Sequence, residues 1–314
     1  MPLSTDPAVT KTGESLVHTL KEIFHPPPGI RPVHAKGILL SGTFTPTPTA
    51  ASLSIAPHFT LPSVPLTARF SSSTGIPVLP DSDPNGNPRG IALRFHLPDD
   101  AQGRRAHTDI IAHSVDAFPG KNGEEALAFF SAVREGKVPE FLGSPEAENA
   151  RKFVAAPDPT PVGLDRATYF AVNTFRLVDE GGKRTNVRYR IVPEKGVTSL
   201  SEEEAKGKGA DFLYEGIKET VGKEGPVVFK LVVQVGEEGD VTVDNTVKWP
   251  EERKLVELGT VKLEKVVEDD PVAAAKRLIF DPIPRVKGVE PSDDPLLDVR
   301  AHAYLVSGRE RRAA

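Results

Sequence analysis

The chain has 314 residues, a formal net charge of −5 and a hydrophobic fraction of 38%. These values are typical of a folded globular protein with room for a buried cofactor, and the mixed charges exclude a basic nucleic-acid-binding surface. The absence of cysteine excludes disulfides, thiolate catalysis and iron–sulfur clusters, and it fits a reducing, cytoplasmic location.

The N-terminal third is predicted to contain one short helix followed by strands. Residues 12–24 have the apolar spacing of a helix, and the prolines at 26–28 end it. No apolar run is long enough for a membrane span, so none is expected. Alternating apolar residues and clusters of turn residues predict the other elements of this third: a turn over 45–50, strands over 64–71, 91–97 and 109–114, and a loop over 77–89.

The rest of the chain is predicted to be a series of strands with helices inserted and at its end. Spacing and turn residues predict helices over 122–135, 201–221, 271–278 and 295–312, a connector over 155–162, and strands over 169–178, 185–192, 227–235 and 256–267. Consecutive strands without regular intervening helices favour antiparallel pairing, and closing such a sheet removes its exposed edges. The sequence therefore predicts an α+β fold, an antiparallel β-barrel with inserted and C-terminal helices. We expect a single domain over 1–314, with 1–24 as an N-terminal arm.

His34 is the first candidate for chemistry. The stretch from Arg31 to Phe44 is predicted to form a strand pair, on which Arg31 and Val33 face one side and His34 the other. A histidine that points into a closed barrel beside a cofactor can act as a general acid or base. An ordinary core or surface histidine is the alternative.

Tyr304 is the second candidate. Arg300 precedes it by four residues, so on a helix the guanidinium lies beside the phenol and stabilises its phenolate form. A phenolate is a hard anionic ligand suited to ferric iron, whereas a surface cation–aromatic contact is the alternative. Arg69 is a third candidate, since it can pair with a carboxylate.

Five segments, in this order, resemble the catalase family and most of all its short haem peroxidase branch. They are RPVHAKG, TARFSSSTGIP, DPNGNPRGIALRFHLPD, VDNTVKWPEERKLVELGTVKLEKV and FDPIPRVKGVEPSDDPLLDVRAHAYLVSGRERR. The resemblance runs from about His25 to Arg312 and includes the segments for both faces of a haem. It implies a haem peroxidase that uses peroxide to oxidise a small organic substrate.

The resemblance also implies residue roles. Tyr304 would ligate the iron of haem b, Arg300 would hold it as phenolate, His34 would move the peroxide proton, and Ser71 would hydrogen-bond near that histidine. The remaining positions match residues around the macrocycle: Arg31, Arg69 and Arg309 beside the propionates, and Phe118 against the ring.

One position departs from the family pattern. The family supplies an asparagine beside the distal histidine, and the matching position here is read as Ser114, with His113 facing away. Because Ser114 is shorter and would act only through water, peroxidase chemistry with weak catalase activity is expected over fast dismutation. A fatty-acid hydroperoxide-converting or fatty-acid-oxidising enzyme and a non-catalytic haem- or lipid-binding barrel are the alternatives. The chain lacks the long arm that helps lock catalase tetramers, so a smaller assembly such as a homodimer is expected.

Overall fold

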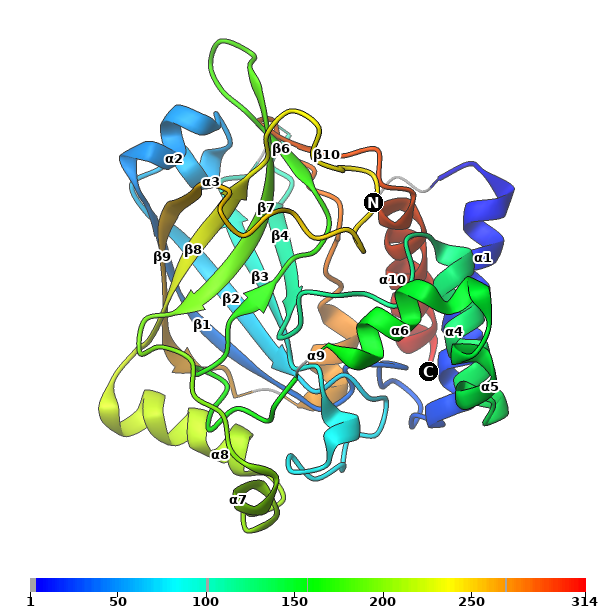
Figure 1. The fold of residues 1–314 in the computed structure, drawn as a ribbon. Helices are drawn as coiled ribbons and strands as arrows, with labels where there is room; N and C mark the ends of the chain where they lie inside the picture. Colours follow the sequence, from blue (N-terminus) through cyan, green and yellow to red (C-terminus); the bar gives the residue numbers. More distant parts are fainter. Residues whose placement is uncertain (1–3, 100–101, 157, 269) are drawn as a thin grey trace.

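The computed structural model describes residues 4–99, 102–156, 158–268 and 270–314, and it shows an antiparallel β-barrel with a group of helices on one side and shorter helices elsewhere around it (Figure 1). The strands are β1 (Gly37–Pro46), β2 (Val64–Ser71), β3 (Gly90–Leu97), β4 (Ala106–His113), β5 (Tyr169–Phe170), β6 (Phe175–Val178), β7 (Arg184–Pro193), β8 (Val227–Val235), β9 (Leu255–Val266) and β10 (Val289–Pro291). Eight of these described strands close the barrel in the order β1-β2-β3-β4-β5-β7-β8-β9, with β9 returning to β1, while β6 and β10 extend from β7. The predicted α+β barrel is confirmed.

The helices lie between strands and at both ends of the described chain. They are α1 (Pro7–Phe24), α2 (Pro48–Leu53), α3 (Pro57–Thr60), α4 (Gly123–Glu135), α5 (Val138–Leu142), α6 (Glu148–Ala155), α7 (Glu202–Lys206), α8 (Phe212–Glu219), α9 (Pro271–Arg277) and α10 (Pro295–Ala313), with short helical turns at Pro84–Gly86, Pro145–Ala147 and Thr220–Glu224. None of the helices in the described ranges is long and apolar enough to cross a membrane.

Several helix boundaries in the structure differ from the predicted ones for local reasons. The first helix begins at Pro7 because Asp6 caps it, accepting a hydrogen bond from the backbone of Ala8. Two helices occupy most of the range 201–221 that was predicted to be helical, since α7 ends at Lys206 before Gly207 and α8 begins at Phe212. The predicted turn over 45–50 contains the start of α2, which Thr47 caps.

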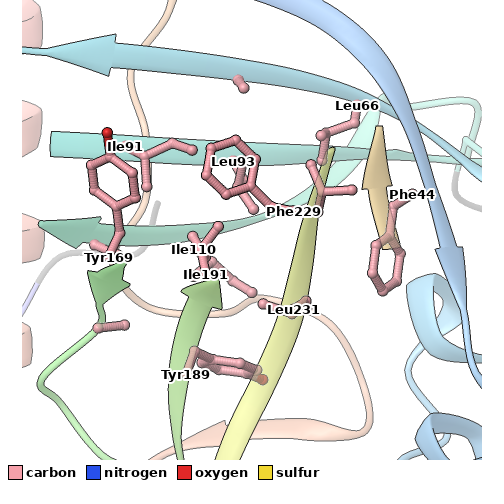
Figure 2. Close-up of a cluster of buried hydrophobic side chains, with 14 of the residues drawn as sticks. Phe44, Leu66, Ile91, Leu93, Ile110, Tyr169, Tyr189, Ile191, Phe229 and Leu231 are labelled. Carbon is pink, nitrogen blue, oxygen red and sulfur yellow. The ribbon is translucent and has the colours of Figure 1, made fainter. Parts of the chain in front are cut away.

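Apolar side chains fill the interior of the barrel (Figure 2). In β2 the buried Leu66 and Phe70 point inward, so the intervening Arg69 faces the outside. Each fully buried side chain of this size contributes roughly 1.5–3 kcal/mol to folding. The barrel interior is therefore a packed core, and the expectation that His34 points into it is wrong.

The helices α1, α4 and α10 pack together beside the barrel (Figure 1). A glycine permits the close approach of α1 and α10, because a Cβ at Gly13 would lie 3.0 Å from Cδ2 of His302. On its other face, α10 adds Leu297 and Ala301 to the barrel core. These contacts set the position of α10 against the outside of the barrel.

The segment before α10 is tied to the outer face of β3 and β4. Arg94 on β3 forms a two-bond ion pair with Asp109 on β4, with Nε to Oδ1 at 2.8 Å and Nη2 to Oδ2 at 2.7 Å. The backbone N–H of Asp281 donates to the same carboxylate at 2.8 Å. All three residues are buried, so this link fixes the path by which the chain enters α10.

Candidate functional site

A row of three residues crosses the outer face of β2, β3 and β4. Ser71 pairs with Gly90, and Gly90 pairs with His113. Opposite residues of an antiparallel ladder direct their Cβ atoms to the same face, about 5 Å apart. The side chains of Ser71 and His113 therefore flank the bare backbone of Gly90.

The ring of His34 lies over this row. A Cβ at Gly90 would be 3.1 Å from Nδ1 of His34 and 2.9 Å from Oγ of Ser71. The same Nδ1 is 3.1 Å from the hydroxyl oxygen of Ser71, which is hydrogen-bond distance. The structure thus brings together His34 and Ser71, as the sequence predicts.

His34 does not lie on a strand, so the predicted alternation of Arg31 and Val33 against His34 is wrong. β1 begins only at Gly37, and His34 has a left-handed φ of 54°. For a residue with a Cβ, this conformation costs roughly 1–2 kcal/mol, so the surrounding bonds must hold it.

Hydrogen bonds from the neighbouring chain supply that restraint. The backbone N–H of His34 donates to the carbonyl of Ser73 at 3.1 Å, and that of Ala35 donates to Thr74 at 3.0 Å. The buried Arg69 donates through Nη2 to the carbonyl oxygens of His34, at 2.9 Å, and of Ala35, at 3.2 Å. Arg69 therefore positions the backbone that carries the histidine.

The imidazole of His34 is held neutral. Burial lowers its pKa to about 3, and the positive charge of Arg69 adds to this effect, followed by His113, Arg31 and Arg300. A neutral ring has a free lone pair at neutral pH. With Nδ1 placed at the Ser71 hydroxyl, Nε2 is the nitrogen left to accept a proton.

The structure corrects the reading of Ser114 and His113. The Ser114 hydroxyl accepts from the backbone N–H of Arg89 at 2.9 Å and donates to Asp158 at 2.9 Å, away from His34. His113 instead stands in the row beside His34. The prediction that Ser114 faces His34 and His113 faces away is therefore wrong. The prediction was off by one residue, and neighbouring residues of a strand direct their side chains to opposite faces of the sheet.

Phe118 packs beside the second histidine. Its ring is stacked with the ring of His113, with centroids 6.4 Å apart and planes 27° apart. It also packs against the apolar cluster of Leu16, Ala126 and Val299 between the helices. Phe118 thus lines the same pocket, where a flat ring can pack against a macrocycle.

Gly90 gives a direct test of this geometry. Gly90→Ala is expected to lower peroxide consumption per bound haem by about 100-fold, because the added methyl would displace His34 or Ser71 and such misplacement costs that order of rate. Steady-state peroxide assays of haem-matched samples measure the effect. Gly216→Ala is the control, since that position is open, and wild-type turnover in Gly90→Ala would place His34 elsewhere.

Tyr304 lies on α10 beside the guanidinium of Arg300, which is 6.0 Å from the centre of its ring. Arg300 is held by the side-chain oxygen of Asn173, and Asn173 in turn donates to Asp294 at 2.7 Å. Asp294 is the capping residue at the start of the same helix. This chain of bonds holds Arg300 next to the ring of Tyr304.

Three arginines gather near Tyr304: Arg69 and Arg311 are buried, and Arg31 is half-buried. Burial lowers the pKa of Arg31 well below its usual range, with further lowering by Arg69 and Arg311 and an opposing effect of Tyr304. Burial likewise lowers the pKa of Arg69 and of Arg311 to about 10, so both remain charged at neutral pH. Their hydrogen bonds go to backbone carbonyls and the Ser307 hydroxyl, and none forms an ion pair with a carboxylate of the described residues.

Arg311, rather than Arg309, is the third member of this cluster. Arg309 is exposed, whereas Arg311 is buried and follows Tyr304 by seven residues, which is two helical turns on the same face. That spacing is the sequence signal that would have identified it.

The residues of the pocket fit a haem. Buried charges without counter-ions are costly, so three unpaired guanidinium groups favour an anionic ligand such as a pair of propionates. The phenol oxygen of Tyr304 is of the kind that ligates haem iron in some haem proteins. Arg31 is within electrostatic range of both Tyr304 and His34, which places the phenol and the imidazole at one site.

Comparisons with known proteins identify the family of the chain. A family model described as catalase matches residues 18–314. The chain is 32% identical over 290 residues to a catalase-related peroxidase of Mycolicibacterium paratuberculosis, covering 90% of each chain. It is 30% identical over 306 residues to a catalase-related peroxidase of Synechococcus elongatus, covering 96% of this chain and 88% of that one.

The fold matches solved catalases. Catalase A from Saccharomyces cerevisiae superimposes with a TM-score of 0.80 at 21% identity, and the match covers 99% of this chain but 65% of the yeast chain. This chain therefore spans about two thirds of the solved relative. With the family model matching nearly its whole length, the chain belongs to the catalase family.

Proposed function

We propose that the protein is a haem b-dependent peroxidase that uses hydrogen peroxide or an organic peroxide to oxidise a small organic substrate, with weak catalase activity. The observation that carries this proposal is the cluster of Arg31, Arg69 and Arg311 beside Tyr304, which have no carboxylate partner among the described residues, on the side of the barrel where His34 is held neutral. A bound haem supplies the iron at which the O–O bond of a peroxide is cleaved.

Each residue of the site would have a separate role around the haem. Tyr304 would hold the iron through its phenol oxygen, with Arg300 held beside its ring. Arg31, Arg69 and Arg311 would bind the propionates. His34 would accept the proton of the incoming peroxide on Nε2 and return it to the leaving oxygen, while Ser71 holds the opposite nitrogen.

We place the organic co-substrate beside the arginine cluster. A cavity of about 460 Å³ lies between the segment 25–32 and the end of α10, and Arg311 lines it. The volume suits a small organic molecule, and the walls of Pro26, Pro27 and Pro28 are apolar. A phenol matches this cavity, because it can pack on the apolar wall and hydrogen-bond to the polar side formed by Lys21, Glu310 and Arg311.

The lipid alternatives have less support. Phe129 and Phe130 would favour a lipid channel only if they lined open space, but Phe129 is buried against the rings of Phe130, Phe141 and Phe153. These contacts are ordinary helix packing. The cytoplasmic location and the homodimer stay predictions of the sequence, and the chemistry does not depend on either.

Product analysis tests the proposal. The haem-loaded protein is given hydrogen peroxide with a phenol in one reaction and a fatty-acid hydroperoxide alone in another. We expect phenol oxidation that requires peroxide and little rearrangement of the lipid. Fast rearrangement of the lipid hydroperoxide would support the lipid enzyme instead, and no turnover of either would indicate a non-catalytic haem-binding barrel.

A further inference from the structure

The cavity of about 460 Å³ beside the arginine cluster is lined by a carboxylate that the proposed haem site does not use. This carboxylate belongs to Glu310, near the end of α10, and it lines the cavity together with Arg311 of the same helix. Arg31 stands between two further lining residues, Ile30 and Pro32, so the cavity borders the cluster to which the propionates are assigned. A molecule in the cavity is therefore next to the edge of the proposed haem site.

The two carboxylate oxygens of Glu310 have different surroundings. Oε2 lies 2.6 Å from the ammonium of Lys21 on α1, and this ion pair joins the two helices at the cavity. Oε1 forms no hydrogen bond or ion pair with the described residues. Because Lys21 holds the carboxylate through one oxygen, the other oxygen is available as an acceptor for a molecule in the cavity.

The other polar side chains of the cavity are less suited to accept a proton. Lysine and arginine carry only N–H donors, so Lys21 and Arg311 cannot accept one. The hydroxyl of Ser307 already accepts a hydrogen bond from Arg311 at 2.5 Å. His25 is exposed, so its ring is turned largely to solvent. Glu310 is thus the acceptor best placed for a neutral O–H group that packs on the apolar wall.

We propose that Glu310 is the proton acceptor for a phenolic reducing substrate bound in this cavity. The phenol O–H bond breaks, its proton passes to Oε1 of Glu310, and one electron passes to the haem that peroxide has oxidised, which leaves a neutral phenoxyl radical. Two phenols give two protons and two electrons, which reduce one hydrogen peroxide to two waters. The proposal rests on the proposed haem peroxidase function, which it deepens by naming the substrate class and the residue that takes its proton.

A phenol needs such an acceptor because it is neutral at pH 7, since a phenolic hydroxyl has a pKa of about 10. Loss of an electron alone would leave a cation in a cavity where Lys21 and Arg311 already carry positive charge. Loss of the proton to Glu310 in the same step leaves the phenoxyl uncharged. Positioned proton transfer of this kind typically contributes about 100- to 10,000-fold to a rate.

The experiment uses the haem-loaded protein with peroxide, and it compares phenol with ferrocyanide as the reducing substrate. Ferrocyanide gives up an electron without a proton, so its oxidation needs no proton acceptor. Glu310→Gln keeps the size of the side chain and a hydrogen-bonding oxygen, but it is not a base. Glu22→Gln is the matched control, because Glu22 also forms an ion pair from α1, with Arg134 at 3.0 Å, and does not line the cavity.

Glu310→Gln is expected to lower kcat for phenol oxidation by about 100-fold and not to slow the oxidation of ferrocyanide. Binding of phenol without peroxide, measured by isothermal titration calorimetry, gives a second readout that does not depend on turnover. Glu310→Gln should bind phenol within about threefold of the wild type, whereas Glu310→Leu should bind it about tenfold more weakly, equivalent to ~1.4 kcal/mol and typical of one lost hydrogen bond.

A wild-type kcat for phenol in Glu310→Gln would overturn the role of Glu310, and so would an equal loss with phenol and ferrocyanide. A loss in His25→Asn with none in Glu310→Gln would assign the proton to His25 instead; asparagine is used there because it tolerates the left-handed φ of 45°. A wild type that holds no haem or oxidises neither donor would overturn the proposed function itself, whereas the calorimetry would still test the phenol subsite.

Discussion

Replacing His34 with alanine is expected to lower the rate of peroxide consumption by about 100- to 10,000-fold, the range that positioned proton transfer contributes. With Nδ1 of His34 at the Ser71 hydroxyl, Nε2 is the nitrogen left free to accept a proton. Its backbone is held by Arg69 and its ring by close contact with Gly90, so the proton acceptor is preorganised. Stopped-flow or steady-state peroxide assays, normalised to bound haem, measure the loss.

The exposed His18→Ala is the matched control, because it removes an imidazole from the surface of α1. Near-unchanged turnover in His34→Ala would contradict the role of His34 as the proton acceptor. Loss of activity together with loss of haem would indicate a structural role, so the haem content of each sample is measured first.

The lowered pKa of His34 also predicts the pH profile of the wild type. Because its pKa is about 3, the ring stays neutral and active through pH 5–8 and loses its lone pair only as the pH falls toward 3. The rate of peroxide consumption should therefore show no falling limb near 6.5, the ordinary pKa of histidine. A limb with an apparent pKa near 6.5 would show that the base is a more exposed group.

Tyr304→Phe is expected to remove the iron ligand and to release haem or change its absorption spectrum. The change deletes one oxygen and leaves the ring, so helix α10 should keep its packing. Gel filtration of haem-loaded samples, with the ratio of haem to protein measured before and after, gives the affinity. We expect the variant to lose most of its haem under conditions in which the wild type keeps it.

Tyr189→Phe is the control for this variant, because it deletes the same oxygen from a tyrosine buried in the barrel core. It should retain haem and the wild-type spectrum. An identical spectrum and haem ratio in Tyr304→Phe would exclude Tyr304 as the ligand.

The barrel and its apolar core were predictable from local pattern. The alternation of Leu66 and Phe70 with Arg69 and Ser71 is visible in the sequence, and the structure keeps it. The pairing that closes the sheet between β7 and β8 was not predictable residue by residue, because register depends on contacts between distant segments.

The site was predictable in its members but less so in its geometry. The residues 31–36 alternate as a strand would, yet the backbone of His34 and Ala35 bonds to Ser73 and Thr74, which no local pattern encodes. The wrong prediction that Ser114, and not His113, lies beside His34 has the same cause. Only the pairing of His113 with Gly90 determines which of the two side chains faces His34. Both errors concern the direction of a side chain, which a shift of one residue reverses.

The absorption spectrum of the purified, haem-loaded wild type tests the central claim most directly. We expect one haem per chain with the spectrum of high-spin ferric iron bound to a phenolate, because Tyr304 is proposed as the iron ligand and His34 as a proton acceptor. A chain that binds no haem, or a low-spin spectrum typical of two histidine ligands, would contradict it.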